Sequence, residues 1–142
     1  MICARGRRAA LVLLIALLSG CGHRATTCAL CGMPIDEKSA WTSELTLSSG
    51  AVQRFDSPRC ALLAWRSGLA EARSMRVRDY YDQTWRDAES VLFVVSSDVI
   101  GPMGPDLVPV DRARASQFAR EHTGTRPLDL AAVTVELLRD LH

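Results

Sequence analysis

The sequence predicts an α+β fold in which two β-β-α-β units form one small domain that ends in a C-terminal helix. Each half of the chain carries two short strand patterns followed by a helix start, with Asp56 before one helix and Asp111 before the other. The final stretch, 130–141, repeats leucine and valine at the spacing of one helix face. A chain of this length suits one compact domain, and the repeated order indicates an internal duplication.

Residues 1–20 are predicted to be a lipoprotein signal peptide. The apolar run 9–18 follows three arginines and falls short of the roughly 20 apolar residues that span a bilayer. It ends in Leu18-Ser19-Gly20-Cys21, which resembles the lipobox of bacterial lipoproteins. That resemblance implies cleavage before Cys21 and acylation of its sulfur and amine, so that 21–27 becomes an acylated linker. We therefore expect a protein of the bacterial cell envelope, anchored in a membrane through Cys21 and facing the periplasm. An ordinary secreted protein is the alternative.

The charge and the cysteines of the mature chain restrict its function. Three of the 17 Lys and Arg residues leave with the signal peptide, so 14 remain against 16 Asp and Glu residues, a net charge of −2. This charge gives no reason to expect nucleic acid as a partner. If Cys21 carries lipid, the thiols of Cys28, Cys31 and Cys60 cannot all pair in disulfides, so one is free or metal-bound.

The first unit is expected to contain two strands, a helix and a third strand. Alternating apolar and polar side chains, a Ser-Ser-Gly turn and a second extended run predict a hairpin. Pro58 suits the first turn of a helix, with Asp56 or Ser57 as the N-cap. The expected elements are strands over 41–47 and 51–55, a helix from 58 to about 67, and a strand over 75–81.

The second unit follows the same order. Five consecutive apolar residues between polar neighbours predict a buried strand, and Asp111 is in place to cap a helix. The expected elements are a strand over 91–95, a loop over 101–105, a strand over 107–110, a helix from 111 to about 121, and a last helix over 130–141 capped by Asp129.

The stretch Cys28-Ala29-Leu30-Cys31-Gly32-Met33-Pro34-Ile35 is the most informative for function. It places two thiols and a thioether within six residues, and these soft sulfur donors suit Cu(I). Gly32 and Pro34 favour irregular or extended backbone. In an extended segment, residues two apart share a face, so Cys31 and Met33 are predicted to present both sulfurs to one ion.

Three other interpretations fit the same residues. Cys28 and Cys31 are spaced as in a thiol–disulfide redox pair or a structural disulfide. They also fit half of a structural zinc site, although such a site needs four ligands and the chain offers three thiols and scattered histidines. Met33 alone is equally consistent with packing in the core.

Three motifs follow one another along the chain: Cys31-Gly32-Met33, Phe55-Asp56 with Cys60 after it, and Met103-Gly104 with Leu107-Val108-Pro109. Together with the lipobox, they resemble the NosL family, the accessory lipoproteins of nitrous oxide reductase biogenesis. The resemblance implies two β-β-α-β units in one α+β domain. It also implies a copper chaperone that binds one Cu(I) and delivers it to nitrous oxide reductase or its maturation complex.

Carried over by motif, Cys31 and Met33 are the first expected copper ligands, and Met103 is the third. The Gly-Pro pairs on both sides of Met103 make a tight loop that can point its sulfur inward. Cys28 is either an additional thiolate or a structural residue. Cys60, inside the first helix, is expected in the core.

His122, at the end of the second helix, is expected to act as a helix-terminal charge rather than as a ligand. The sequence shows no Ser/His/Asp set, phosphate-binding loop or paired carboxylates, so we expect no enzyme activity. Two or three soft ligands on an exposed loop hold Cu(I) and leave a position open for a receiving ligand, as a carrier requires.

Overall fold

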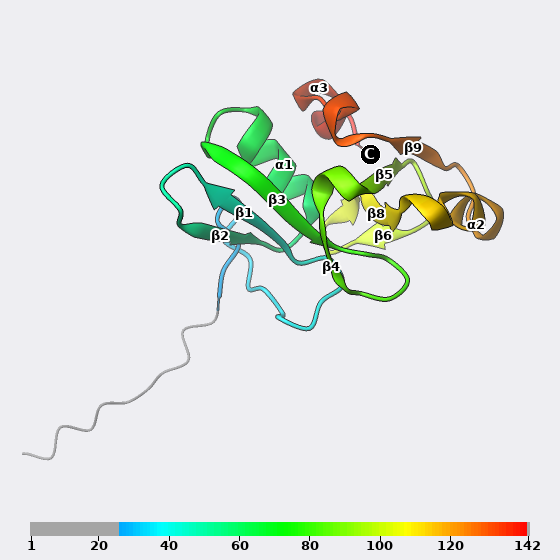
Figure 1. The fold of residues 1–142 in the computed structure, drawn as a ribbon, viewed down its shortest axis with the longest axis horizontal. Helices are drawn as coiled ribbons and strands as arrows, with labels where there is room; N and C mark the ends of the chain where they lie inside the picture. The colour runs from blue at the N-terminus through cyan, green and yellow to red at the C-terminus, as the bar shows by residue number, and fades with distance from the viewer. Residues whose placement is uncertain (1–25, 142) are drawn as a thin grey trace, which may run out of the picture.

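The computed structural model describes residues 26–141, and it shows the two expected units side by side (Figure 1). The predicted signal peptide and Cys21 lie outside the described residues. No helix between Thr26 and Leu141 has the length and the apolar character needed to cross a membrane.

The first unit is a four-stranded antiparallel sheet in the order β2-β1-β3-β4, with one helix packed on β1 and β2. The register pairs Ser43 with Phe55 across the β1–β2 hairpin and Leu45 with Met75 across β1 and β3. Its elements are β1 (Ser43–Leu47), β2 (Val52–Phe55), α1 (Pro58–Arg66), β3 (Ala72–Arg78) and β4 (Trp85–Asp87).

The second unit repeats this arrangement as a three-stranded antiparallel sheet in the order β8-β5-β9. In both units the first strand is central, the second strand lies on one side, and the strand after the helix lies on the other. This shared topology confirms the predicted pair of β-β-α-β units. The elements are β5 (Val91–Val95), β8 (Val108–Asp111), α2 (Ala115–Glu121) and β9 (Arg126–Leu128), with a small ribbon of β6 (Ile100–Gly101) and β7 (Gly104–Pro105) inserted between β5 and β8.

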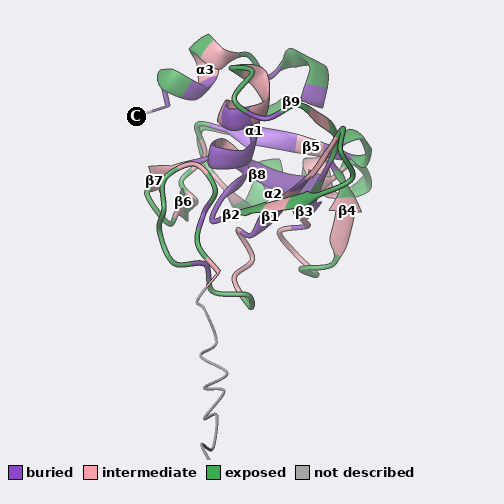
Figure 2. Cartoon of the chain, turned by 90° about the vertical axis from the view of Figure 1, so that its left-hand side faces the viewer, coloured by how far each residue is buried: buried purple, intermediate pink, exposed green. Residues whose placement is uncertain are grey.

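The core lies between the helices and the two sheets, and Figure 2 shows its buried residues gathered in α1, β5 and β8. Helix α1 begins as the sequence predicts, because Pro58 occupies its first turn and the Ser57 hydroxyl accepts a hydrogen bond from the Cys60 amide at 3.3 Å. Its inner face, which includes Leu62, is buried. This capped, half-buried helix is what positions Cys60 and the preceding Asp56.

The prediction of a single C-terminal helix over 130–141 is wrong in detail. A 3₁₀ segment (Leu130–Ala132) is followed by extended backbone at Val133, and a separate helix, α3 (Val135–Arg139), begins after it. Thr134 interrupts the helix because its hydroxyl caps α3 by accepting from the Leu137 amide at 3.3 Å. The predicted cap Asp129 instead pairs with Arg112 at 2.6 Å.

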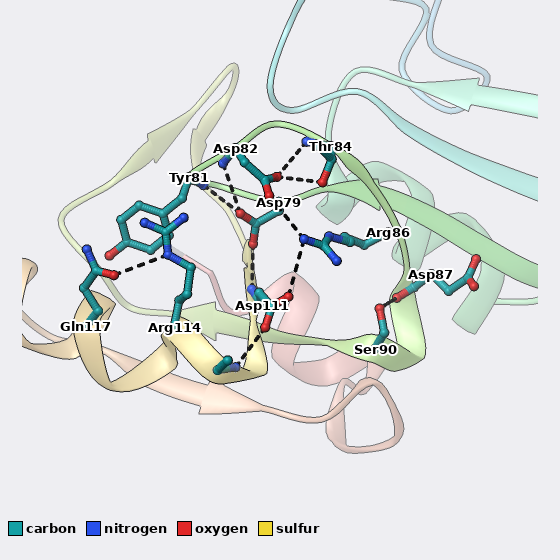
Figure 3. Close-up of polar contacts among 11 residues, drawn as sticks. Asp79, Tyr81, Asp82, Thr84, Arg86, Asp87, Ser90, Asp111, Arg114 and Gln117 are labelled. Carbon is teal, nitrogen blue, oxygen red and sulfur yellow. Dashed lines mark hydrogen bonds and ion pairs between the residues drawn. The ribbon is translucent and has the colours of Figure 1, made fainter.

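The third strand also differs from its predicted range, since β3 begins earlier and ends at Arg78 rather than Tyr81. The buried carboxylate of Asp79 ends it by accepting hydrogen bonds from the amides of Tyr81 and Asp82 at 3.0 and 3.2 Å (Figure 3). Its other oxygen accepts from the Asp111 amide at 2.6 Å, where β8 leads into the second helix. One side chain therefore joins the β3–β4 turn of the first unit to the second unit.

We expect Asp79→Ala to lower the free energy of unfolding by about 2–4 kcal/mol, because it leaves backbone donors without their acceptor. Asp79→Asn keeps one carboxamide oxygen and should cost about half as much. Chemical denaturation monitored by circular dichroism measures both changes. The matched control is Asp87→Ala, since Asp87 is exposed and caps nothing, and it should change stability by less than about 0.5 kcal/mol. A cost for Asp79→Ala no larger than that of the control would contradict the assigned role.

Candidate metal centre

The Cys28–Ile35 stretch folds as a tight turn that leads into a short bridge. The Cys28 amide donates to the Met33 carbonyl at 2.8 Å, and the Gly32 amide donates to the Cys28 carbonyl at 2.9 Å. Gly32 has a φ of +76°, a left-handed conformation that favours glycine. The extended geometry expected for Cys31 and Met33 is therefore wrong, because the backbone reverses between them.

The turn brings three thiols and a carboxylate together. One ligand atom from each of Cys28, Cys31, Cys60 and Asp56 lies within 4.8 Å of the others. The first two come from the turn, Asp56 from the end of β2, and Cys60 from the first turn of α1. A backbone hydrogen bond from Ala29 to the Arg54 carbonyl, at 3.0 Å, ties the turn to β2. None of the cysteines between residues 26 and 141 is in a disulfide.

The cluster is buried on one side and open on the other. Cys28 and Cys60 are buried, whereas Cys31 is exposed. Burial raises the pKa of the Cys28 and Cys60 thiols, and the neighbouring Asp56 carboxylate raises the pKa of both further. These two thiols are therefore protonated in the absence of metal, and an incoming ion must displace their protons. Cys31 is the sulfur that an ion or a partner meets first.

Asp56 is the carboxylate of the cluster and is only 5% exposed. Its Oδ1 accepts a hydrogen bond from the Cys31 thiol at 3.6 Å. Its Oδ2 is fully buried and has no hydrogen-bond partner among the residues that the structure describes. Asp56 is not the helix cap, because Ser57 caps α1. This buried, half-satisfied carboxylate faces the thiols.

The two predicted methionine ligands flank the cluster. Met103 lines a cavity of about 280 Å³ together with Cys31 and Cys60. Met33 lines a second cavity, of about 120 Å³, together with Asp56. Both methionines are exposed, Met33 by 37% and Met103 by 56%. Each methionine thus lines a cavity that at least one residue of the cluster also lines.

The loop that carries Met103 is held against the first unit by Asp106. This buried carboxylate accepts from the amides of Arg59, at 2.9 Å, and Leu107, at 2.8 Å, and burial raises its pKa to about 6. A side chain at Gly101 would place its Cβ 2.7 Å from the Asp106 Cβ, so only glycine fits there. The Gly-Pro residues around Met103 thus form the compact β6–β7 ribbon.

His122 takes no part in the cluster. It follows α2, its Nδ1 lies 2.7 Å from an Asp98 carboxylate oxygen, and its ring stacks on Phe118 with centroids 4.2 Å apart. This position agrees with the expected helix-terminal role. Sequence reasoning placed Cys60 in the core and treated Asp56 as a cap, so it missed both as members of the cluster. The odd number of thiols was the available signal, because it leaves one cysteine free or metal-bound.

Two comparisons with known proteins found similar proteins. The model of the NosL family matches residues 22–138. The crystal structure of the copper chaperone NosL from Shewanella denitrificans is similar, with a TM-score of 0.67 and 22% sequence identity over 76% of this chain and 89% of that one. At this identity the likeness establishes the fold. No curated protein sequence matches the chain.

Proposed function

Because the chain belongs to the NosL family, we propose that it is a copper chaperone that binds one Cu(I) and passes it on without catalysing a reaction. The observation that supports this function best is a cluster of thiols with an exposed cysteine, flanked by two exposed methionines. Thiolates and thioethers are soft donors, and their combination selects Cu(I) over hard cations.

Each expected ligand has a position that suits this role. Cys31 is the central ligand, because it belongs to the cluster and is exposed. Met103 shares a cavity with Cys31, and Met33 shares a separate cavity with Asp56. Cys28 supplies a second thiolate from the buried side of the cluster. We propose these four residues as the copper ligands, with the two methionines forming the open side.

Delivery proceeds by ligand exchange. A donor atom of the receiving protein approaches the exposed side, binds the ion, and displaces the neutral methionine sulfurs first. The thiolates then leave and recover their protons from solvent, and copper stays Cu(I) throughout. Because burial raises the pKa of the Cys28 thiol, protonation favours release once a partner competes for the ion.

The thiol–disulfide alternative has less support. Reactive Cys-x-x-Cys pairs place the first thiol at a helix N-terminus, which lowers its pKa. Here Cys28 and Cys31 lie in a turn, and burial raises the pKa of Cys28. A buried, protonated thiol is a poor nucleophile for disulfide exchange.

The receiving protein that we propose is nitrous oxide reductase or its maturation complex, outside the cytoplasm. A lipid on Cys21 would hold the domain at the membrane by a short linker, 21–27, and leave the copper face free to turn toward the periplasm. The receiving protein is proposed from the role of the family, and the membrane anchor is proposed from the lipobox.

A transfer assay tests this function. The full chain is loaded with one Cu(I) under anaerobic conditions and mixed with metal-free nitrous oxide reductase, whose copper centres are followed by their absorption. We expect copper to reach the reductase at least about tenfold faster than from a Cu(I)–glutathione complex at equal copper, because the exposed side lets a partner ligand bind before release. Transfer no faster than from glutathione would contradict the proposal.

A further inference from the structure

Met103 is an expected copper ligand whose own side chain is not fixed by packing, since it is 56% exposed. The β6–β7 ribbon closes with the pair of Gly101 and Gly104, and Met103 lies in the tip between them. A ribbon of two short strands is only marginally stable by itself in water. The position of the Met103 sulfur relative to the thiols therefore depends on what holds the base of the ribbon.

Asp106, directly after β7, holds this base against the start of α1. Its Oδ1 accepts hydrogen bonds from the Arg59 amide at 2.9 Å and from the Leu107 amide at 2.8 Å. The residue is only 4% exposed, and β6 packs on it, because a Cβ at Gly101 would lie 2.7 Å from the Asp106 Cβ. One carboxylate thus fixes both strands of the ribbon to the helix.

The contact with Arg59 is a helix cap that comes from a distant part of the chain. The amides in the first turn of a helix have no acceptor within the helix itself. In α1, Pro58 has no amide hydrogen, and the Ser57 hydroxyl accepts from the Cys60 amide. Asp106 accepts from the Arg59 amide between them, where the positive end of the helix dipole also favours a carboxylate. Because the same turn carries Cys60, this cap connects the Met103 ribbon to an element of the thiol cluster.

The side chain of Arg59 adds a second attachment. Its guanidinium donates to the carbonyl of Pro105, the last residue of β7, at 3.3 Å. It also donates to the carbonyl of Leu138, in α3, at 3.0 Å, which fixes the guanidinium in place. The ribbon is therefore held at Pro105 as well as at Asp106.

We propose that Asp106 is a positioning residue for copper binding, which holds the Met103 thioether where it and the Cys31 thiolate reach the same Cu(I). Met103, Asp106 and Cys31 line one cavity of about 280 Å³, so a displacement of the ribbon moves one sulfur relative to the other. Asp106 is not a ligand in this role, because its Oδ1 is occupied by backbone amides and a soft ion prefers sulfur. The role rests on the proposed copper function and names the residue on which the contribution of Met103 depends.

A double-mutant cycle separates positioning from stability. The reduced, full-length chain in detergent is titrated with Cu(I) against a chromophoric chelator under anaerobic conditions. Asp106→Ala and Met103→Leu should each weaken Cu(I) binding about tenfold, as the loss of a residue that orients a ligand typically does. The double variant should bind no more than about twofold more weakly than either, because the contribution of Met103 is already lost in Asp106→Ala. Additive losses would overturn the proposal.

Two further variants serve as rescue and control. Asp106→Asn should stay within about threefold of wild type, because its carboxamide oxygen still accepts from both backbone amides. Asp79→Ala removes another buried carboxylate that accepts backbone amides, and its partners lie outside the copper site. It should leave the Cu(I) affinity of the folded protein within about twofold. An equal loss of affinity in Asp79→Ala and Asp106→Ala would reduce Asp106 to a purely structural role.

Carbon-13 labelling of the methionine methyl groups follows the ligand itself by NMR. In wild type, the Met103 methyl resonance should shift when one Cu(I) binds. In Asp106→Ala it should stay at its metal-free position, while the Met33 resonance still shifts. Equal shifts of the Met103 resonance in wild type and in Asp106→Ala would overturn the positioning role and leave the copper function standing. Absence of Cu(I) binding by wild type would refute both.

Arg59→Met provides the test if Asp106→Ala does not fold. This variant releases the Pro105 carbonyl but keeps the Arg59 backbone amide, and with it the Asp106 contact. In this background, the further loss of Cu(I) affinity caused by Met103→Leu should fall from about tenfold to about threefold. An undiminished effect of Met103→Leu would show that the attachment of the ribbon does not position its sulfur.

Discussion

Replacing Cys31 with serine is expected to lower the affinity for Cu(I) at least about a hundredfold, because an alcohol oxygen is a poor ligand for a soft ion. Cys31 is the exposed thiol of the cluster and shares a cavity with Met103, whereas the Cys28 and Cys60 thiols are buried. Competition with a Cu(I)-specific chelator under anaerobic conditions measures the change. The fold should be unaffected, since Cys31 is on the surface.

Two companion variants separate copper binding from thiol chemistry. Cys28→Ser should weaken Cu(I) binding less than Cys31→Ser. Met33→Leu should weaken it while leaving the fold intact, because leucine keeps the size and apolarity of methionine and lacks only its sulfur. A redox pair, in contrast, needs both cysteines and no methionine. Equal and complete loss in both cysteine variants, with Met33→Leu identical to wild type, would favour thiol exchange.

Replacing Cys21 with alanine is expected to move the protein from the membrane fraction of the cell to the soluble fraction. The lipobox ending in Cys21 predicts that this sulfur carries the lipid that anchors the protein. Cell fractionation followed by immunoblotting measures the distribution. Cys28→Ser is the matched control, because it removes a thiol outside the lipobox and should keep the membrane location. Membrane retention of Cys21→Ala at the wild-type level would refute the anchor.

Local patterns in the sequence were sufficient to predict the fold class. The β1–β2 hairpin, the N-cap of α1 and the buried β5 depend on alternation, turn residues and capping within a few positions. Asp111 caps the 3₁₀ turn before α2 by accepting from the Ala113 amide at 2.9 Å, as its position suggested. The duplication followed from comparing these local signals in the two halves.

Errors arose where a side-chain cap or a tertiary contact interrupts an element that its local pattern would continue. The apolar spacing over 130–141 suits a continuous helix, but Thr134 caps a separate helix after extended backbone at Val133. Similarly, strand β3 ends at Arg78 because Asp79 turns to bind the amide of Asp111, which is 32 residues away in sequence. A single sequence carries no direct signal for such contacts.

The candidate site was predicted only in part, because some of its residues are distant from one another in sequence. Cys28, Cys31 and Met33 are close in sequence, so their donors stood out together. Asp56 and Cys60 join them only because the Cys28–Cys31 turn packs beside the start of α1. Each has an ordinary local explanation, as a helix-start residue or a buried cysteine, which concealed their shared position. The sequence revealed three thiols, and the structure places the Asp56 carboxylate beside them as a fourth donor.

The most direct test of the central claim is the stoichiometry of Cu(I) binding by the reduced protein, measured by anaerobic titration against a chromophoric Cu(I) chelator. The cluster and the flanking methionines predict that one Cu(I) per chain is withdrawn from the chelator, with a sharp end point at one equivalent. Failure to withdraw copper, or an end point that Cys31→Ser leaves unchanged, would contradict the account.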